Sequence, residues 1–263
     1  MNINLEGKVA LVCGASQGMG RETALRFAEC GADVIAVSRN IDLLNSLLLE
    51  FSNNGNQRHT YVAADFKNYM DSFDSISEHV RNHYAGVDII INNSGGPKSG
   101  KLVDAEIEDF INAFNSHLFI SQLLVKHFSK GMAAKKDGRI INIVSVSARQ
   151  PIDNLGVSNT LRGAMLSWAK TLSKELGGFG ITVNNILPGY TATDRLNSLF
   201  ERESDRLNIN IEDVKQNILS KIPARRLGMP DELSYLAVFL ASDYAKYING
   251  VSIPIDGGFI SCV

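Results

Sequence analysis

The sequence has little of what marks a secreted, disulfide-bonded or membrane protein. It holds three cysteines in 263 residues, and Cys13, Cys30 and Cys262 have the spacing of neither a metal site nor a disulfide framework. A low, odd number of cysteines is typical of a reducing cytoplasm. No apolar run reaches the 18 residues that a membrane span needs, and the residues before Lys8 lack the apolar core of a signal peptide. We therefore expect a cytoplasmic protein without a membrane partner.

Excess charge of one sign is also missing. The chain has 26 Lys and Arg against 28 Asp and Glu, a formal net charge of −2, so it is not drawn as a whole to nucleic acid or to anionic membranes. Repeats, low-complexity tracts and linker-like segments are absent, and 44% hydrophobic with 21% charged residues is ordinary for a globular protein. The economical prediction is a single domain over residues 1–263.

Short, continuously apolar runs alternate with longer amphipathic segments. Continuous hydrophobicity is typical of strands that are buried on both faces. Such strands are expected at 9–13, 33–38, 60–64, 87–92, 139–144, 181–187 and 251–255. Helices are expected at about 18–30, 40–52, 68–84, 104–134, 154–177 and 231–241. The alternation predicts an α/β fold, a doubly wound parallel sheet of about seven strands with helices on both faces.

One charged segment, residues 192–222, interrupts this rhythm before the last strand. Its pattern predicts two short helices. An insertion after the carboxyl end of a strand lies where ligands bind in such sheets. We interpret it as a substrate flap; the alternative is a solvated pair of helices without a role.

A glycine-rich turn, CGASQGMG, follows the first expected strand. Gly14, Gly18 and Gly20 allow the backbone to turn sharply and to approach a ligand closely. The helix that begins near Gly18 directs free N–H groups and a positive dipole end toward this turn, and a pyrophosphate fits there. Glycines also serve ordinary turns, but the position after the first strand of a parallel sheet favours a dinucleotide site.

The end of the second strand indicates which dinucleotide is bound. An acidic residue at this place would bind the ribose 2′-hydroxyl of NAD, but the strand ends in Ser38, Arg39 and Asn40. An arginine can pair with a 2′-phosphate, which favours NADP(H) over NAD(H). The alternative is a surface arginine that caps a loop.

Further motifs follow in a fixed order along the chain. They are CGASQGMG (13–20), Asp65, INNSG (91–95), Asn115, GRIINIVS (138–145), VNNILPGYTATD (183–194) and NGVSIPIDGG (249–258). Over nearly its whole length the sequence resembles the short-chain dehydrogenase/reductase family, whose fold is a Rossmann-type sheet. Within the family it is similar to a divergent branch of the 3-oxoacyl-[acyl-carrier-protein] reductase-like group.

The resemblance implies roles for residues along the cofactor. Asp65 would bind the adenine amino group, and Asn92 would stabilise the centre of the sheet and the cofactor ribose. Each has a plainer alternative, because Asp65 could cap a helix and Asn92 could belong to a turn. The remaining residues would line the pyrophosphate and adjacent ribose (Gly14, Ser16, Gly18, Gly20) or border the nicotinamide (Pro188, Gly189, Thr193).

The catalytic residues are where the sequence departs from the family. The family uses a serine that orients the carbonyl, a tyrosine as general acid or base, a lysine that lowers the tyrosine pKa, and an asparagine that holds a water. Ser145 and Asn115 match the serine and the asparagine. The tyrosine is expected 13 residues after Ser145 and the lysine four residues later, but Ser158 and Arg162 stand there. Residues 146–189 contain no tyrosine, so a small shift of the alignment does not restore the motif.

This exchange weakens proton transfer. A serine hydroxyl is a much weaker acid than a tyrosine, and Arg162 keeps a positive charge but does not release a proton. Loss of one proton-transfer group typically costs a factor of about 10²–10⁴ in rate. We hypothesise that Tyr190, or a water chain through Asn115, supplies the proton. The alternative for Tyr190 is simple packing under the flap.

The resemblance implies an oxidoreductase that transfers a hydride between NADP(H) and a carbonyl or alcohol, 3-oxoacyl-[acyl-carrier-protein] reductase-like. Its substrate would be a small carbonyl compound or an acyl thioester. One alternative is a catalytically impaired dinucleotide-binding protein that acts as a sensor or scaffold. Another is a reductase for a different ketone, such as a sugar or a steroid.

Three further patterns concern partners and metals. The helix expected at 157–177 has an apolar stripe wider than one sheet requires, which favours a homo-oligomer, a dimer or tetramer, over a helix sandwiched within one domain. The basic segment 126–139 could dock an acyl carrier protein or be a solvated helix end. His79 and His83 have metal-binding spacing, but no third ligand converges on them, so a solvated helix face is expected.

Overall fold

The computed structural model describes residues 2–52 and 57–262 and confirms the predicted sheet. Seven parallel strands lie in the order β3-β2-β1-β4-β5-β6-β7. Reversal of strand order beside β1 creates the switch point at which such sheets bind ligands. The strands are β1 (Val9–Cys13), β2 (Asp33–Ser38), β3 (Thr60–Ala63), β4 (Ile89–Asn92), β5 (Gly138–Ile143), β6 (Ile181–Pro188) and β7 (Ser252–Ile255).

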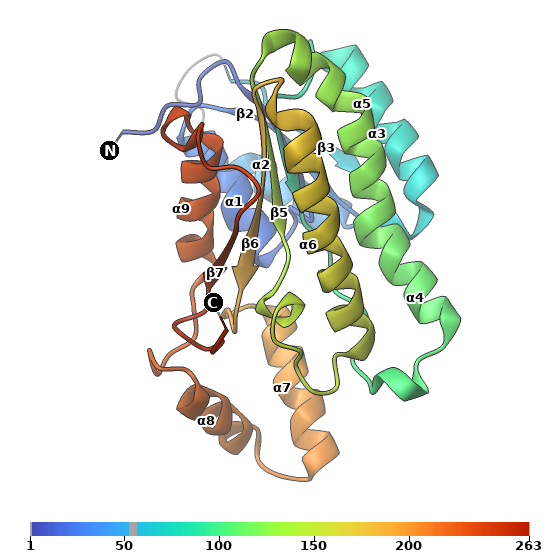
Figure 1. The fold of residues 1–263 in the computed structure, drawn as a ribbon, viewed down its shortest axis with the longest axis vertical. Coiled ribbons are helices and arrows are strands. Elements are labelled where there is room, and N and C mark those ends of the chain that lie inside the picture. The colour runs from blue at the N-terminus through green and yellow to red at the C-terminus, as the bar shows by residue number, and fades with distance from the viewer. Residues whose placement is uncertain (1, 53–56, 263) are drawn as a thin grey trace.

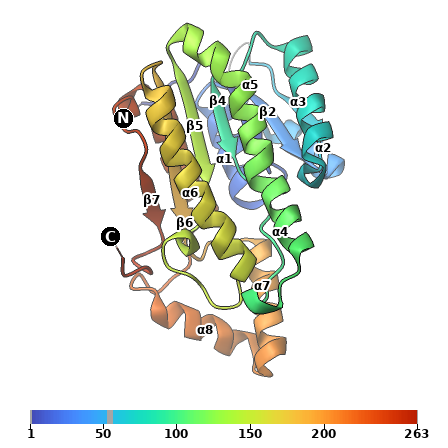
Figure 2. The same cartoon turned by 45° about the vertical axis from the view of Figure 1, so that its right-hand side comes forward.

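Helices cover both faces of the sheet, as Figures 1 and 2 show. One face carries α1 (Gly18–Glu29), α2 (Ile41–Glu50) and α9 (Pro230–Ala241), and the other carries α3 (Tyr69–His83), α5 (Ile120–Lys135) and α6 (Gly156–Gly177). Alternate residues of β1 enter the two separate cores, Val12 on the α1 side and Leu11 on the α5 side. Burial on both faces explains why the strands are continuously apolar.

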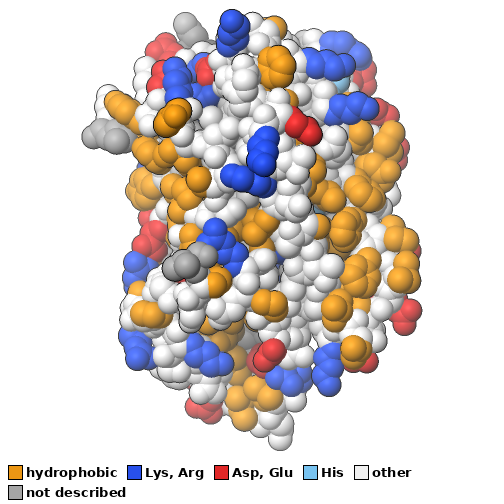
Figure 3. Space-filling view, in the orientation of Figure 1, with side chains coloured by type: hydrophobic (Ala, Val, Ile, Leu, Met, Phe, Trp, Pro, Cys, Tyr) orange, Lys and Arg blue, Asp and Glu red, His pale blue; other side chains and the backbone are white. Residues whose placement is uncertain are grey.

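Apolar side chains also remain exposed on one edge of the molecule. They lie on and beside α4 (Ile107–Phe114), on the right-hand side of Figure 3. The exposed fractions of Val103 and Ile107 are 89% and 72%, whereas Trp168 of α6 donates to Gln122 of α5 at 2.7 Å. The wide stripe of α6 therefore packs partly against α5, and the exposed apolar surface belongs to α4.

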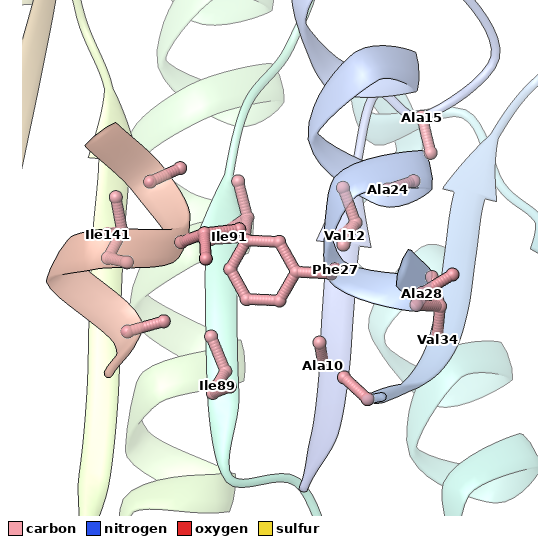
Figure 4. Packing of buried hydrophobic residues seen from close by; sticks show 14 of the residues in the cluster. Ala10, Val12, Ala15, Ala24, Phe27, Ala28, Val34, Ile89, Ile91 and Ile141 are labelled. Atoms are coloured by element: carbon pink, nitrogen blue, oxygen red, sulfur yellow. The ribbon is translucent and has the colours of Figure 1, made fainter. Parts of the chain in front are cut away.

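The α1 core shows why this half of the sheet is rigid. Phe27 of α1 is fully buried and points onto β1 and β4, toward Val12, Ile89 and Ile91 (Figure 4). Small alanines, among them Ala24 and Ala28, let the helix approach the strands closely. Burying one phenylalanine contributes about 1.5–3 kcal/mol. The packing holds the start of α1, where the glycine turn lies, at a fixed place above the sheet.

The prediction of a single helix at 104–134 is wrong, because the helix is interrupted in its middle. The chain forms α4, then a π-helical turn (Asn115–Phe119), then α5. A π turn inserts one residue into the helical repeat and rotates the side chains that follow it. The rotation turns His117 into the protein, where it is 5% exposed. Periodicity alone gives no sign of this interruption.

The charged segment near the end of the chain forms the two predicted short helices, α7 (Asp194–Leu207) and α8 (Ile211–Lys221). They extend beyond the carboxyl ends of the strands, at the bottom of Figures 1 and 2. Leu196, Phe200 and Val214 form a small core of their own there. In the described parts of the chain, no helix is both long and apolar enough to cross a membrane.

Candidate active site

The glycine turn has the geometry of a phosphate cradle. Gly14 and Gly18 have φ of 63° and 56°, a conformation that favours glycine. A Cβ on Gly20 would lie 2.1 Å from the carbonyl oxygen of Gly14, so no side chain fits at that position. Gln17 gives α1 no side-chain cap within the described chain, which leaves its first N–H groups for a ligand. The turn therefore fits the pyrophosphate of a dinucleotide.

The end of β2 is also prepared for a charged ligand. The Ser38 hydroxyl donates to the Ser16 hydroxyl at 2.7 Å, which ties β2 to the glycine turn. Asn40 caps α2 by accepting from the Leu43 N–H at 3.0 Å. Capping therefore falls to Asn40, and the exposed Arg39 forms neither a hydrogen bond nor an ion pair with any described residue. Its guanidinium is available to a 2′-phosphate.

Asp65 caps a helix, which is the alternative role that the sequence analysis gave for it. Its Oδ1 accepts from the Lys67 N–H at 3.1 Å and caps the short helix Phe66–Asn68. This contact uses one carboxylate oxygen, so binding of the adenine amino group by Asp65 stays a prediction.

Asn92 begins a buried chain of amides that crosses the sheet. Its Nδ2 donates to Asn142 at 2.8 Å, Asn142 donates to Asn185 at 2.8 Å, and Asn185 donates to the Ser252 hydroxyl at 3.0 Å. The four residues face one another on β4, β5, β6 and β7. We call them the asparagine ladder. Oδ1 of Asn92 is buried and has no partner among the described residues, so it can accept a hydrogen bond from a ligand or water.

Ser145, Ser158 and Arg162 lie on two facing segments. The Ser145 hydroxyl follows β5 and accepts from the Ser147 N–H at 3.0 Å. Val146 and Val157, their neighbours in sequence, pack in one apolar cluster. Ser158 is buried in the first turns of α6, and Arg162 points inward one turn later, where Nη1 donates to the Ile143 carbonyl at 3.1 Å. Arg162 therefore reaches the end of β5, two residues before Ser145, whereas Asn115 forms a contact elsewhere.

Asn115 points away from this group, and His117 takes its place. The Asn115 amide donates to the Lys67 carbonyl at 3.3 Å. His117 lines a small cavity together with Asn92 and Arg162, and its Nε2 lies 3.1 Å from the Gly95 carbonyl oxygen. Burial, then the charge of Arg162, holds the His117 pKa well below its usual value. The side chain is therefore a neutral imidazole near Arg162.

A signal for His117 was present in the sequence. It precedes Ile120 by three residues and Ser121 by four, so the three share the inward face of the following helix. All three are buried, whereas Asn115 falls on another face. The motif match had favoured the asparagine, because asparagine is the residue that the family uses.

Tyr190 packs under the flap, which is the alternative that the sequence analysis gave to a role as proton donor. Its ring meets Phe259 edge-on, with 5.1 Å between centroids, and contacts the small core of α7 and α8. Burial raises the Tyr190 pKa, and Glu203 and Asp153 raise it further. A raised pKa makes the phenol a weaker acid, the opposite of what proton donation requires.

The remaining predicted residues lie at and just after the carboxyl end of β6. Thr193 caps α7 by accepting from the Leu196 N–H, and its Cγ2 would lie 3.2 Å from a Cβ on Gly18. Pro188 ends β6. A Cβ on Gly189 would lie 2.7 Å from that of Asp256, so the turn requires a glycine. Thr193 therefore lies directly beside the start of α1, next to the glycine turn.

Two other candidate sites, the basic segment 126–139 and the pair of His79 and His83, form contacts within the protein. Lys135 pairs with Asp88 at 2.6 Å and Arg139 with Asp137 at 2.7 Å. These basic residues lie at the amino ends of the strands, at the opposite edge from Ser145. His79 accepts from or donates to Thr60 at 2.9 Å and stacks near His83.

Comparisons with known proteins agree with this geometry. Residues 14–260 match the family described as Enoyl-(Acyl carrier protein) reductase. The chain is 33% identical to 3-oxoacyl-[acyl-carrier-protein] reductase FabG of Escherichia coli, over 97% of this chain and 98% of that protein. It is 34% identical to 2-dehydro-3-deoxy-D-gluconate 5-dehydrogenase of Pseudoalteromonas atlantica, over 98% and 97%. The fold matches L-sorbose reductase of Gluconobacter frateurii, complexed with NADPH and L-sorbose, with a TM-score of 0.93 and 28% identity over all of both chains. The chain belongs to the short-chain dehydrogenase/reductase family.

Proposed function

We propose that the protein is an NADP(H)-dependent carbonyl reductase in which Ser145 keeps the position of the family's serine and Ser158 and Arg162 replace its tyrosine and lysine. The observation that carries the proposal is the inward direction of Arg162, which donates to the Ile143 carbonyl two residues before Ser145, in a chain whose glycine turn keeps its positive φ values. Arg39 would hold the 2′-phosphate of the cofactor. A scaffold that had lost its chemistry has no need of a buried cation at this place.

The chain's own residues have separate tasks. The cofactor, when bound, supplies a hydride. The Ser145 hydroxyl orients the carbonyl oxygen, and Arg162 stabilises the negative charge that develops on it, since a fixed charge in a site without water acts strongly. The Ser158 hydroxyl donates a hydrogen bond and passes on a proton from water. His117 is neutral and bonded to Gly95, so it positions the loop rather than supplying the proton.

The substrate is a small ketone that enters between the flap of α7 and α8 and the loop after β4. The relatives named above act on an acyl thioester, a sugar acid and a ketose, so the family alone does not choose among these. Carrier-protein docking through 126–139 is not favoured, because this segment lies at the opposite edge of the sheet.

A homo-oligomer accompanies this proposal. Val103, Ile107 and Ile111 are exposed along α4, and a contact with a second copy would remove this apolar surface from water. Sedimentation analysis of the protein tests the assembly, and a monomer at micromolar concentration would contradict it.

The test of function is NADPH oxidation by three ketones, an acetoacetyl thioester, 5-dehydro-D-gluconate and L-sorbose. Cofactor binding is followed separately by NADPH fluorescence. We expect oxidation with at least one ketone, and its loss in Ser145→Ala with unchanged NADPH affinity. NADPH binding without oxidation by any ketone would instead support the sensor or scaffold alternative.

A further inference from the structure

Arg162 is a buried cation without a counter-charge. Its side chain is 8% exposed, and the Ile143 carbonyl is its one hydrogen-bond partner in the described residues. Nε is buried and has no partner there. A buried charge is normally paired, because its desolvation otherwise costs several kcal/mol, on the order of the stability of a domain. A ligand that carries a negative charge would supply the missing partner.

A second arginine reaches the same site from the flap. Arg195, in the first turn of α7, extends to the loop after β4, where Nη1 donates to the Gly96 carbonyl at 3.0 Å. His117 holds the adjacent carbonyl, that of Gly95, from below. Arg195 therefore contacts the loop whose first residues, Asn93 and Ser94, line the cavity of Arg162. Burial, and then the charge of Arg195, lowers the pKa of Arg162 to about 10, and Arg195 makes a smaller contribution to the lowered pKa of His117.

Neither arginine forms an ion pair within residues 2–52 and 57–262. The acidic side chains of the region are Asp153, Asp194 and Glu203, and Glu203 is held by Arg206. Exposed Arg202 adds a further positive charge seven residues after Arg195, on the same face of α7. Arg195 and Arg202 thus place two positive charges on one face of α7, although the chain as a whole carries a net charge of −2.

We propose that the substrate carries a carboxylate close to its reacting carbonyl, and that Arg195 together with Arg162 binds it. This inference rests on the proposed function, because it places the carboxylate beside Ser145. A guanidinium binds a planar carboxylate through two parallel hydrogen bonds. Release of the Gly96 carbonyl by Arg195 would let the flap close on the bound anion. The site then prefers a keto acid to a neutral thioester or ketose.

Binding of acetoacetate and methyl acetoacetate to the NADP⁺-saturated protein tests this directly. The two probes share one ketone and differ in the carboxylate, and the oxidised cofactor prevents their reduction. By calorimetry we expect acetoacetate to bind at least about tenfold more tightly, as a charge-assisted bidentate contact requires. Arg195→Gln should remove the preference. Arg206→Gln, on the same helix but paired with Glu203, should retain it.

The cofactor's phosphates are the other anions that Arg195 could meet. A titration with NADP⁺ alone separates the two, because a substrate site predicts unchanged NADP⁺ affinity in Arg195→Gln. Strong loss of NADP⁺ affinity with the acetoacetate preference intact would overturn the proposal, as would equal or absent binding of both probes in the unmodified protein. Failure of the proposed function would be seen separately, as absent NADP⁺ binding or oxidation that does not depend on Ser145.

Discussion

Two regions of this molecule are built differently: the glycine turn with β1, α1 and β2, which we call the cofactor half, and Ser145 with the first turns of α6, which we call the catalytic half. Around β1, α1 and β2 the geometry is made by the backbone: positive φ at Gly14 and Gly18, and an approach at Gly20 that excludes any Cβ. Around α6 the proposed site is made by side chains, those of Ser158 and Arg162 on the first turns of a regular helix. A backbone site changes only with the fold, whereas side chains on a rigid helix are exchanged one at a time.

The largest effect is expected when the catalytic half is returned to the family pattern. In Ser158→Tyr/Arg162→Lys, a phenol with a neighbouring ammonium supplies the acid that serine lacks. We expect kcat to rise by about 10²–10⁴, the usual contribution of a proton-transfer group. NADPH oxidation with the best ketone measures this, alongside NADPH fluorescence. The gain should disappear when Ser145→Ala is added. Unchanged kcat with intact NADPH affinity would mean that Ser158 and Arg162 do not limit the reaction.

Most of the fold was readable from the sequence, because strands buried on both faces leave long apolar runs. β2 was predicted to the residue, and the two flap helices were expected from their charge pattern. The π turn was missed, since one inserted residue leaves hydrophobic periodicity almost intact. Contact between Arg195 and Gly96 joins residues 99 positions apart, and no local pattern encodes such an approach.

The asparagine ladder crosses the sheet from β4 to β7, so breaking its middle should cost stability. Asn142→Ala leaves Nδ2 of Asn92 and Oδ1 of Asn185 buried and unpaired, at about 1–3 kcal/mol for each group. Ser252→Ala, at the end of the ladder, leaves one amide unpaired beside a half-buried position and should cost about 1 kcal/mol. Urea unfolding measures both. Equal losses in the two variants would argue against additive pairing along the ladder.

In the cofactor half, one added methyl group should weaken NADPH binding. Gly20→Ala places its Cβ 2.1 Å from the Gly14 carbonyl oxygen, so the cradle must shift. We expect the Kd for NADPH to rise by about 10- to 100-fold, as when a few hydrogen bonds of the cradle are lost. Gly163→Ala is the matched control on α6: a Cβ there meets nothing within 4 Å, and the helix should gain about 0.5–1 kcal/mol. Equal NADPH affinity in both variants would contradict the assignment of the glycine turn as the phosphate-binding site.

The free energy of unfolding should depend on pH below about 6.5, because His117 is buried as a neutral side chain. Its pKa is lowered in the folded protein, so below a pH of about 6.5 the unfolded chain binds more protons and the free energy of unfolding falls as the pH falls. The slope from one such histidine is at most about 1.4 kcal/mol per pH unit. His117→Asn should be less acid-sensitive, whereas His59 and His79, whose pKa values are also lowered, remain in both proteins. Identical pH profiles would contradict the neutral, buried state of His117.

The smallest effect is expected at Tyr190, which packs beneath the flap. Tyr190 stacks on Phe259, and its raised pKa makes it a poor acid. Tyr190→Phe keeps the ring and removes the hydroxyl, so kcat should be unchanged at every pH at which the enzyme is stable. Because phenylalanine preserves the packing, a fall in kcat by about 10² or more would have to come from the hydroxyl, and it would make Tyr190 the missing proton donor. Serine at position 158 would then be explained by a displaced acid rather than by slow transfer from water.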